Sequence, residues 1–181
     1  MDESGLLMAP LVRRTLAPRG HPPVMMQGAG RREKVSVAAA LWLPPDRKSL
    51  RLSFQTLANQ FFDPQYSALF LEALTHEVGG KVIVVWDGGP MHKGGPIREV
   101  LEHYSERLSL ERLPPYAPQI NPVEPVWSWL KHSRLCNYAP KSAVDLEGRV
   151  LAGLKQAAQD ERLVKGFFLA SELPPPRTLL T

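Results

Sequence analysis

The pattern of apolar and polar residues predicts a pair of β-strands in the first third of the chain. The segments are residues 34–43 and 49–57, and the second follows a period of two. The sequence between them, Pro44-Pro45-Asp46, is rich in residues that favour turns. We therefore expect the two strands to pair antiparallel. A shorter strand is expected within residues 1–12.

Apolar residues at helical spacing predict a helix from Pro64 to the residue before Gly79. Asp63 has the side chain of an N-cap, and proline suits the first helical position. Glycine at the other end is the usual stop for a helix. Further helices are expected after Gly94, near 122–135 and near 143–170.

The run Val82–Trp86 is continuously apolar and is bounded by glycines, which is typical of a strand that is buried on both faces. Residues 108–113 predict one more strand. The order of early hairpin and later helix–strand crossovers predicts an α/β protein. We expect an RNase H-like mixed sheet with helices on both faces and a helical C-terminal extension. Its domain is expected to span residues 1–172, with 173–181 as a flexible, proline-rich tail.

Composition and charge narrow the class of protein. The chain has 181 residues, 44% of them hydrophobic, which is enough for one sizeable core. The single cysteine, Cys136, cannot form an internal disulfide, which favours a reducing compartment. No apolar run is long enough to span a membrane, and no secretory signal is visible. We expect a cytoplasmic protein without a membrane partner.

The formal net charge of +4 is concentrated near the N-terminus. Residues 1–34 hold six basic and three acidic residues, a net of +3. Arg13, Arg14 and Arg19 lie in this loop-like stretch. The stretch is either a solvated loop or an arm that contacts phosphate groups of nucleic acid.

Three carboxylates occupy positions that suit a metal-dependent phosphodiester enzyme. Asp87 ends the Val82–Trp86 strand, Glu124 begins a helix after a proline-rich loop, and Asp2 lies on the first predicted strand. Magnesium prefers oxygen ligands, and paired ions can activate a water or a 3′-hydroxyl group. We therefore expect two Mg²⁺ (or Mn²⁺) ions bound by these residues.

Each of two carboxylates also has a purely structural interpretation. Asp87 could merely begin the turn that follows its strand. Glu124 lies three residues after Asn121, and Pro122 follows that asparagine, which is the spacing of a capping box. In that case the glutamate would bond to the amide of Asn121 and would have no catalytic role.

Other candidates lie close to these carboxylates. On the helix near 122–135, Trp127 falls on the apolar stripe and is expected in the core. Trp129 points to the opposite side, toward DNA or under a loop. Lys131 lies at the basic helix end, where it could bind phosphate or simply complement the helix dipole. His92, five residues after Asp87, could orient a substrate or a metal-bound water, or be an ordinary surface histidine.

Together these segments resemble the catalytic domain of DDE transposases of the mariner superfamily, in the bacterial insertion-sequence branch. The resemblance is carried by Asp2-Glu-Ser-Gly5, Ala17-Pro-Arg-Gly20, Val84-Val-Trp-Asp87 with His92-Lys93, and Leu113-Pro-Pro-Tyr-Ala-Pro through Asn121-Pro-Val-Glu124 to Trp127 and Leu130-Lys131. Two features depart from the family pattern. Asp87-Gly88-Gly89 replaces the usual Asp-Asn-Ala, and no helix-turn-helix region precedes Asp2.

The resemblance implies DNA strand cleavage and strand transfer during transposition of an insertion element. It implies that Asp2, Asp87 and Glu124 are the catalytic, metal-binding triad. The implied partner is double-stranded DNA, at element ends and target, bound by a homodimer. An upstream helix-turn-helix region or reading frame would supply end recognition. The candidate DNA contacts are Arg13, Arg14, Arg19, His92, Lys93, Trp129 and Lys131; the structural candidates are Asn121, Pro122 and Trp127.

Two alternatives stay open. The chain could be an inactive remnant that binds DNA or full-length transposase without catalysis. It could also be a general RNase H-type nuclease, although the proline-rich loop favours a transposase.

Overall fold

The fold was analysed in a computed structural model, in which residues 1–25 and 33–179 are described. Three strands pair antiparallel in the order β1 (Asp2–Leu7), β2 (Lys34–Trp42) and β3 (Arg51–Ala58). Two further strands, β4 (Val82–Trp86) and β5 (Leu108–Arg112), pair parallel. The expected hairpin of β2 and β3 is confirmed, with Ala39 opposite Phe54.

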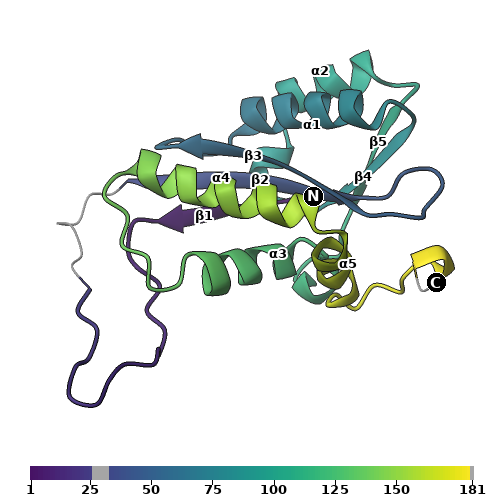
Figure 1. The fold of residues 1–181 in the computed structure, drawn as a ribbon. Coiled ribbons are helices and arrows are strands. Elements are labelled where there is room, and N and C mark those ends of the chain that lie inside the picture. Colours follow the sequence, from purple (N-terminus) through teal and green to yellow (C-terminus); the bar gives the residue numbers. More distant parts are fainter. Residues whose placement is uncertain (26–32, 180–181) are drawn as a thin grey trace.

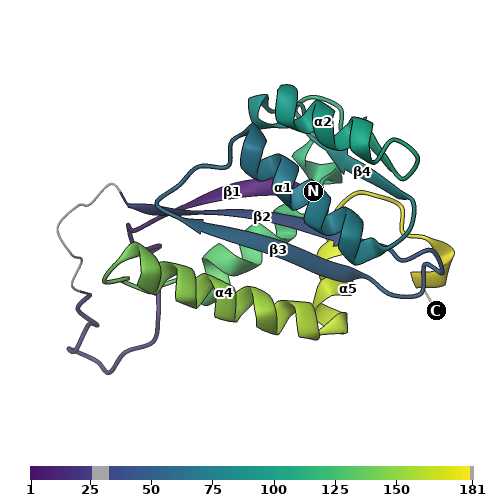
Figure 2. The ribbon, with the colours of Figure 1, turned by 90° about the horizontal axis from the view of Figure 1, so that it is seen from above.

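Helices cover both faces of the strands, as Figure 1 shows. On one face lie α1 (Pro64–Val78) and α2 (Gly95–His103). On the other lie α3 (Glu124–Trp129), α4 (Ala143–Gln159) and α5 (Glu161–Leu169). Seen from above in Figure 2, α4 runs alongside β3 while α1 and α2 lie together over β4. The α/β layering expected from the sequence is confirmed.

Local capping rules explain the limits of α1. The Asp63 side chain accepts a hydrogen bond from the Tyr66 amide at 2.9 Å, and Pro64 occupies the first helical position. At the other end Gly79 has a φ of 71°, a left-handed conformation that glycine adopts at little cost. Both ends agree with the prediction.

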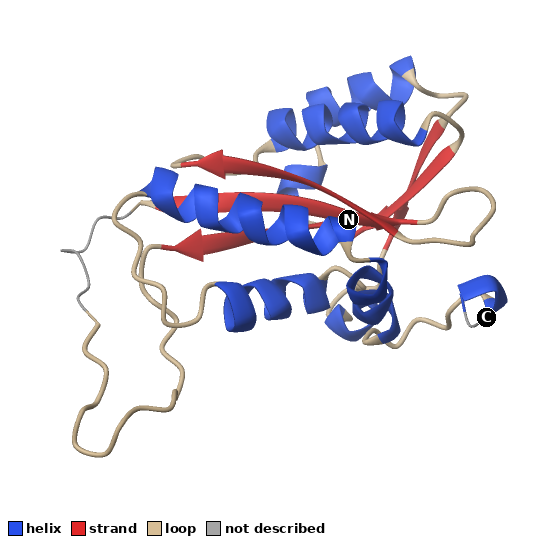
Figure 3. Cartoon of the chain, viewed as in Figure 1, coloured by secondary structure: helices blue, strands red, loops and turns tan. Residues whose placement is uncertain are grey.

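Two expectations about the elements were wrong. The β4 strand is buried on one face only, because Ile83 and Val85 remain 69% and 42% exposed. The expected helix near 143–170 is two helices, since Asp160 ends α4 and caps α5 by accepting from the Leu163 amide at 3.0 Å. The helix expected near 122–135 is confirmed, as α3 continued by a π-helix over Leu130–Arg134; Figure 3 shows this stretch as helix.

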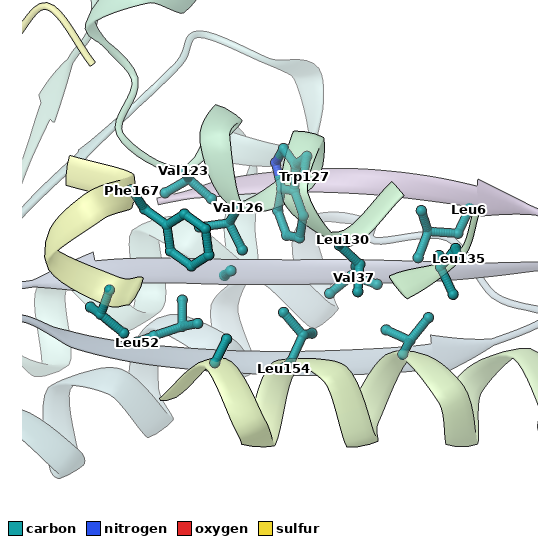
Figure 4. Close-up of a cluster of buried hydrophobic side chains, with 14 of the residues drawn as sticks. Leu6, Val37, Leu52, Val123, Val126, Trp127, Leu130, Leu135, Leu154 and Phe167 are labelled. Atoms are coloured by element: carbon teal, nitrogen blue, oxygen red, sulfur yellow. The ribbon is translucent and has the colours of Figure 1, made fainter. Parts of the chain in front are cut away.

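The core has two parts, one on each face of the strands. The first joins β1, β2 and β3 to the helices α3, α4 and α5, and Figure 4 shows its centre, where Trp127 and Val126 meet Val37 and Leu154. The second joins β4 and β5 to α1 and α2 and contains Trp86, which is fully buried. The candidate carboxylates lie where these two parts adjoin.

Of the segment expected as a flexible tail, residues 173–179 are described. Leu179 is buried in the first part of the core, and the Thr178 hydroxyl donates to the Arg47 carbonyl at 2.6 Å. These contacts attach the segment to the domain. Within the described residues, no helix has the length and apolar character needed to cross a bilayer.

Candidate active site

Three separate elements carry the three candidate carboxylates. Asp2 is the first residue of β1, Asp87 directly follows β4, and Glu124 is the first residue of α3. The Met1 amino group donates to the Val85 carbonyl at 2.9 Å, which places the start of β1 beside the end of β4. Figure 1 shows the same meeting of the N-terminus with β4.

Asp2 is a buried carboxylate tied to α3. Its Oδ2 accepts a hydrogen bond from Trp127 Nε1 at 2.8 Å, across the first part of the core. Burial raises the pKa of Asp2 to about 6; the Trp127 hydrogen bond opposes this shift, and the charges of Glu124 and Glu3 add to it. A cation beside Asp2 would offset this repulsion and favour the ionised form.

Glu124 does not form the capping box that its spacing allowed. The Asn121 side chain instead accepts from the Val123 amide at 3.1 Å, and the Glu124 amide donates to the Asn121 carbonyl at 3.2 Å. Among the described residues, no hydrogen bond ties the Glu124 carboxylate to the amide of Asn121. The carboxylate is exposed and open to a ligand.

Asp87 is held at one oxygen and open at the other. Its side chain is 57% exposed, and Oδ1 accepts from the Gly89 amide at 2.8 Å. A Cβ at Gly89 would lie 3.0 Å from that oxygen and 2.6 Å from Met91 Sδ. The glycine that departs from the family pattern is therefore what allows the backbone to approach this carboxylate so closely.

His92 lies inside the protein, whereas the sequence suggested a residue that contacts DNA at the surface. Its side chain is 2% exposed, and the ring stacks on Trp86 with centroids 4.0 Å apart and planes 12° apart. Nδ1 lies 2.8 Å from Asp87 Oδ1, and Nε2 lies 2.8 Å from Glu3 Oε2. Burial lowers the pKa of His92, but the hydrogen bonds and charges of Glu3 and Asp87 outweigh it, so the pKa is raised above its ordinary value.

Sequence reasoning missed Glu3. The signal was present, because neighbouring residues of a strand point to opposite faces and two adjacent acids therefore serve two different sites. Asp2 turns toward α3 and Glu3 toward the loop after β4. Nothing in the sequence indicated that His92, 89 positions away, would lie opposite Glu3.

The donor atoms suit a divalent cation, although they are not gathered into a finished site. Carboxylate oxygens are the ligands that Mg²⁺ prefers. Within residues 1–25 and 33–179, no group of three or more His, Cys, Asp or Glu side chains is already close enough to hold an ion. Burial, with a smaller contribution from the charges of Glu124 and Glu3, raises the pKa of Asp2, and a bound cation would favour its ionised form. Asp87 and Glu124 are exposed and accessible to such a cation.

The remaining candidates are distributed around this site. Arg13, Arg14 and Arg19 lie on the exposed segment that follows β1, where the Arg13 amide donates to Asn137 Oδ1 at 2.8 Å. Lys93 is exposed after the loop of His92, and Lys131 is half-buried in the π-helix. The part of the basic stretch at residues 26–32 lies outside the described residues.

The two tryptophans of α3 lie in different surroundings. Trp127 is buried in the first part of the core, as its position on the apolar stripe suggested. Trp129 is half-buried, with its ring edge-on to Phe167 at 5.6 Å and the Arg134 guanidinium 5.0 Å above it. Pro122 is half-buried beside the buried Asn121.

An open groove of about 750 Å³ runs beside Glu124. Arg13, Ser128, Trp129 and His132 are among the residues that line it. The groove thus brings a cation, a hydroxyl, an aromatic ring and an imidazole next to a candidate catalytic carboxylate.

A model of the DDE superfamily endonucleases matches residues 1–147, the range that contains Asp2, Asp87 and Glu124. The chain belongs to this family. The match assigns the chain to endonucleases of the DDE type in general and assigns no role to a single residue. No curated protein sequence matches this DDE endonuclease.

The DDE endonuclease chain is similar in fold to solved structures of Mos1 transposase. The Mos1 transposase paired-end complex with left transposon end has a TM-score of 0.63 at 16% identity and covers 98% of this chain. The Mos1 mariner paired-end complexes with Mn and with Mg have TM-scores of 0.62 and 0.59, at 16% and 15% identity, and each covers 93%. The fold is therefore RNase H-like.

This DDE endonuclease spans about half the length of the Mos1 chains, covering 52%, 52% and 51% of them. Its likeness to Mos1 concerns the fold of that half.

Proposed function

We propose that this chain is the catalytic domain of a transposase that cleaves DNA strands and joins the freed 3′-hydroxyl to target DNA. The observation that carries the proposal is that three separate elements of a DDE endonuclease carry Asp2, Asp87 and Glu124, with Glu124 close enough to Asp2 for its charge to raise the Asp2 pKa. Rigid elements hold catalytic groups in place better than loops do.

In this proposal the three carboxylates hold two Mg²⁺ or Mn²⁺ ions. Bound ions of this kind activate a water or a 3′-hydroxyl and stabilise the leaving oxygen of a phosphodiester. Asp2 contributes a carboxylate fixed by Trp127, and Asp87 and Glu124 contribute carboxylates that face solvent. Complexes of Mos1 with Mn and with Mg are consistent with this choice of ions.

The proposed substrate is double-stranded DNA, at the ends of an insertion element and at its target. The groove beside Glu124 would hold the strand that is cut, with Trp129 as a surface for a base and His132 and Arg13 near phosphate groups. The exposed Arg14, Arg19 and Lys93, together with Lys131, would contact the flanking backbone. A homodimer on DNA and a separate helix-turn-helix region for end recognition complete the proposal.

Nicking of supercoiled plasmid DNA tests the proposal without knowledge of the element ends. We expect slow conversion to the nicked form with Mn²⁺ or Mg²⁺, and none with a chelator. Glu124→Gln keeps the size of the side chain and removes its charge, and should reduce nicking at least about 100-fold. The matched control, Glu106→Gln, changes an exposed acid that follows α2 and should leave nicking unchanged.

Three outcomes would count against this function. Nicking that persists in the chelator, or that is equal in Glu124→Gln and wild type, would contradict the assignment of Asp2, Asp87 and Glu124 as a metal-binding triad. Retention of DNA binding without any nicking by the wild type would favour the alternative of a non-catalytic remnant.

A further inference from the structure

His92 is a buried ring that joins two carboxylates from opposite ends of the sequence. Its Nε2 lies 2.8 and 3.0 Å from the two oxygens of Glu3, and its Nδ1 lies 2.8 Å from Asp87 Oδ1 and 3.1 Å from the Asp87 carbonyl. Both oxygens that face Nδ1 can only accept when Asp87 is ionised, so Nδ1 carries a hydrogen and donates. His92 Nδ1 therefore donates to the backbone carbonyl of Asp87, and it lies within ion-pair distance of Oδ1 of the same residue, the candidate metal ligand.

The surroundings of His92 leave it little freedom to move. Trp86, which is itself fully buried, stacks on the ring at 4.0 Å with an angle of 12° between the planes. On the far side Glu3, with a side chain only 9% exposed, lies on β1 at a position paired with Ala38 of β2. Stacking on Trp86 thus fixes the plane of the ring, and the contact with Glu3 fixes the position of Nε2.

Asp87, in contrast, has a largely exposed side chain that would rotate freely without these contacts. The Gly89 amide donates to Oδ1, and His92 Nδ1 lies 2.8 Å from the same oxygen as an ion-pair partner while it donates to the Asp87 carbonyl. Among the described residues, none is recorded as donating to Oδ2, which makes that oxygen the one open to a ligand. The two oxygens of one carboxylate therefore have different tasks.

We propose that Glu3 and His92 are positioning residues that fix Asp87 through its Oδ1 and so present Oδ2 alone to the divalent cation. The proposal rests on the proposed metal-binding role of Asp87. It also gives β1 two tasks, because Asp2 on one face would bind the metal while Glu3 on the other face orients a second ligand through His92.

Two substitutions of His92 separate positioning from general stability. His92→Asn places a side-chain amide nitrogen near the position of Nδ1, where it can still donate to Asp87. His92→Gln places its amide near Nε2, which keeps the contact with Glu3 and loses the one with Asp87. Both variants lose the stacked ring, so both should lower the melting temperature by similar amounts.

The measurement is Mn²⁺ affinity of the DNA-free chain, from the electron paramagnetic resonance signal of free Mn²⁺. We expect His92→Gln to weaken binding about 10- to 100-fold, the usual effect of losing a group that orients a metal ligand. We expect His92→Asn to stay within about threefold of the wild type. Equal affinities of the two variants would overturn the proposal.

Two substitutions of Glu3 give an independent test that does not depend on the folding of the His92 variants. Glu3→Gln removes the charge but keeps an oxygen that accepts from His92 Nε2, whereas Glu3→Ala removes the anchor. Positioning predicts weaker Mn²⁺ binding in Glu3→Ala and nearly unchanged binding in Glu3→Gln. Equal weakening in both would mean that Glu3 acts only through its charge, which contradicts the proposal.

Asp87→Asn distinguishes failure of this proposal from failure of the proposed function. If Asp87→Asn binds Mn²⁺ as tightly as the wild type, the metal-binding role of Asp87 is wrong and both proposals fall. If Asp87→Asn loses binding while His92→Gln keeps it, the metal role stands and the positioning role is wrong.

Discussion

At the scale of single residues, the burial of Asp2 costs the domain stability. The carboxylate lies against the core and accepts a hydrogen bond from Trp127. It is close enough to Glu124 and Glu3 for their charges to raise its pKa. A raised pKa in the folded state means that ionisation of Asp2 destabilises the metal-free protein. A candidate metal ligand is thus kept at the expense of stability, as is common at functional sites.

Asp2→Asn should therefore stabilise the metal-free domain in a pH-dependent manner. The pKa of Asp2 rises from 3.8 to about 6 on folding, so the cost is absent below about pH 4, grows as the pH rises, and is complete above about pH 6. At pH 8 the variant should be more stable by up to about 3 kcal/mol. Thermal denaturation at pH 4 and pH 8 measures this difference.

Divalent cations provide the control for that measurement. Mn²⁺ should raise the melting temperature of the wild type and have little effect on Asp2→Asn, because the variant lacks a ligand. A stability difference that is the same at both pH values would contradict the assignment of its cause to ionisation of Asp2.

Gly89 offers a second test at this scale. Its backbone has a φ of −53° and a ψ of 155°, which alanine also adopts, so Gly89→Ala should act through its Cβ alone. That Cβ would displace Asp87 or Met91, and we expect about tenfold weaker Mn²⁺ binding with little change in folding. Gly88→Ala is the matched control, since its Cβ meets nothing within 4 Å. Equal effects of the two substitutions would show that the close approach at Gly89 is unimportant.

At the scale of elements, Trp127 joins α3 to β1. Its ring fills the first part of the core while its Nε1 donates to Asp2, so one side chain contributes both to the packing of α3 and to the position of a candidate metal ligand. Figure 4 shows Trp127 between Val126 and Leu130, above the strands. The element that carries Glu124 is in this way fastened to the element that carries Asp2.

Trp127→Phe should separate these two tasks. Most of the apolar packing remains, but Asp2 loses its donor, and we expect a loss of about 2–4 kcal/mol in the free energy of unfolding at pH 8. In the wild type the Trp127 hydrogen bond lowers the pKa of Asp2, so in Trp127→Phe that pKa should rise above about 6. Stabilisation by Mn²⁺ should then begin at a higher pH than in the wild type. Denaturant unfolding at pH 6 and pH 8, with and without Mn²⁺, measures both effects.

Trp129→Phe is the comparison for this element, since Trp129 is half-buried and is not recorded as a donor to any carboxylate among the described residues. It should cost less stability and leave the pH dependence unchanged. If both tryptophan variants behave alike, the contact of Trp127 with Asp2 has no special role.

At the scale of the whole molecule, the candidate site lies at the junction of two cores, and a basic segment lies apart from both. The three arginines after β1 are exposed and belong to a stretch that holds most of the net positive charge. Contacts of such side chains with phosphate groups release counterions, so they make DNA binding dependent on salt.

Replacement of Arg13, Arg14 and Arg19 together by glutamine should flatten that dependence. If all three contact phosphate, the slope of log K against log salt should fall by about 3, since each contact contributes about 0.9. Fluorescence anisotropy with a labelled duplex at several salt concentrations gives the slope. The matched control replaces Lys81, Arg98 and Lys155, which are exposed elsewhere in the domain. An equal change of slope in the two variants would mean that binding is diffuse and that this segment has no particular role.

Much of the element structure could be predicted because short-range rules decide it. The limits of α1 follow from Asp63, Pro64 and Gly79, whose capping chemistry lies within a few residues of each end. The break at Asp160 has the same kind of cause and could have been found, since Asp160 caps α5 through the Leu163 amide. The exposed face of β4 could not, because exposure depends on which elements pack above a strand and not on its own residues.

The sequence by itself determined which elements form and which of them carry the acids: Asp2 on a strand, Asp87 after a strand and Glu124 at the start of a helix. Hydrogen bonding and side-chain periodicity act over short distances along the chain, so they are written in local sequence. Only the tertiary structure decided that Trp127 donates to Asp2, and that His92 lies between Glu3 and Asp87. Those partners are remote in sequence, and their meeting depends on the packing of whole elements, which no local pattern records.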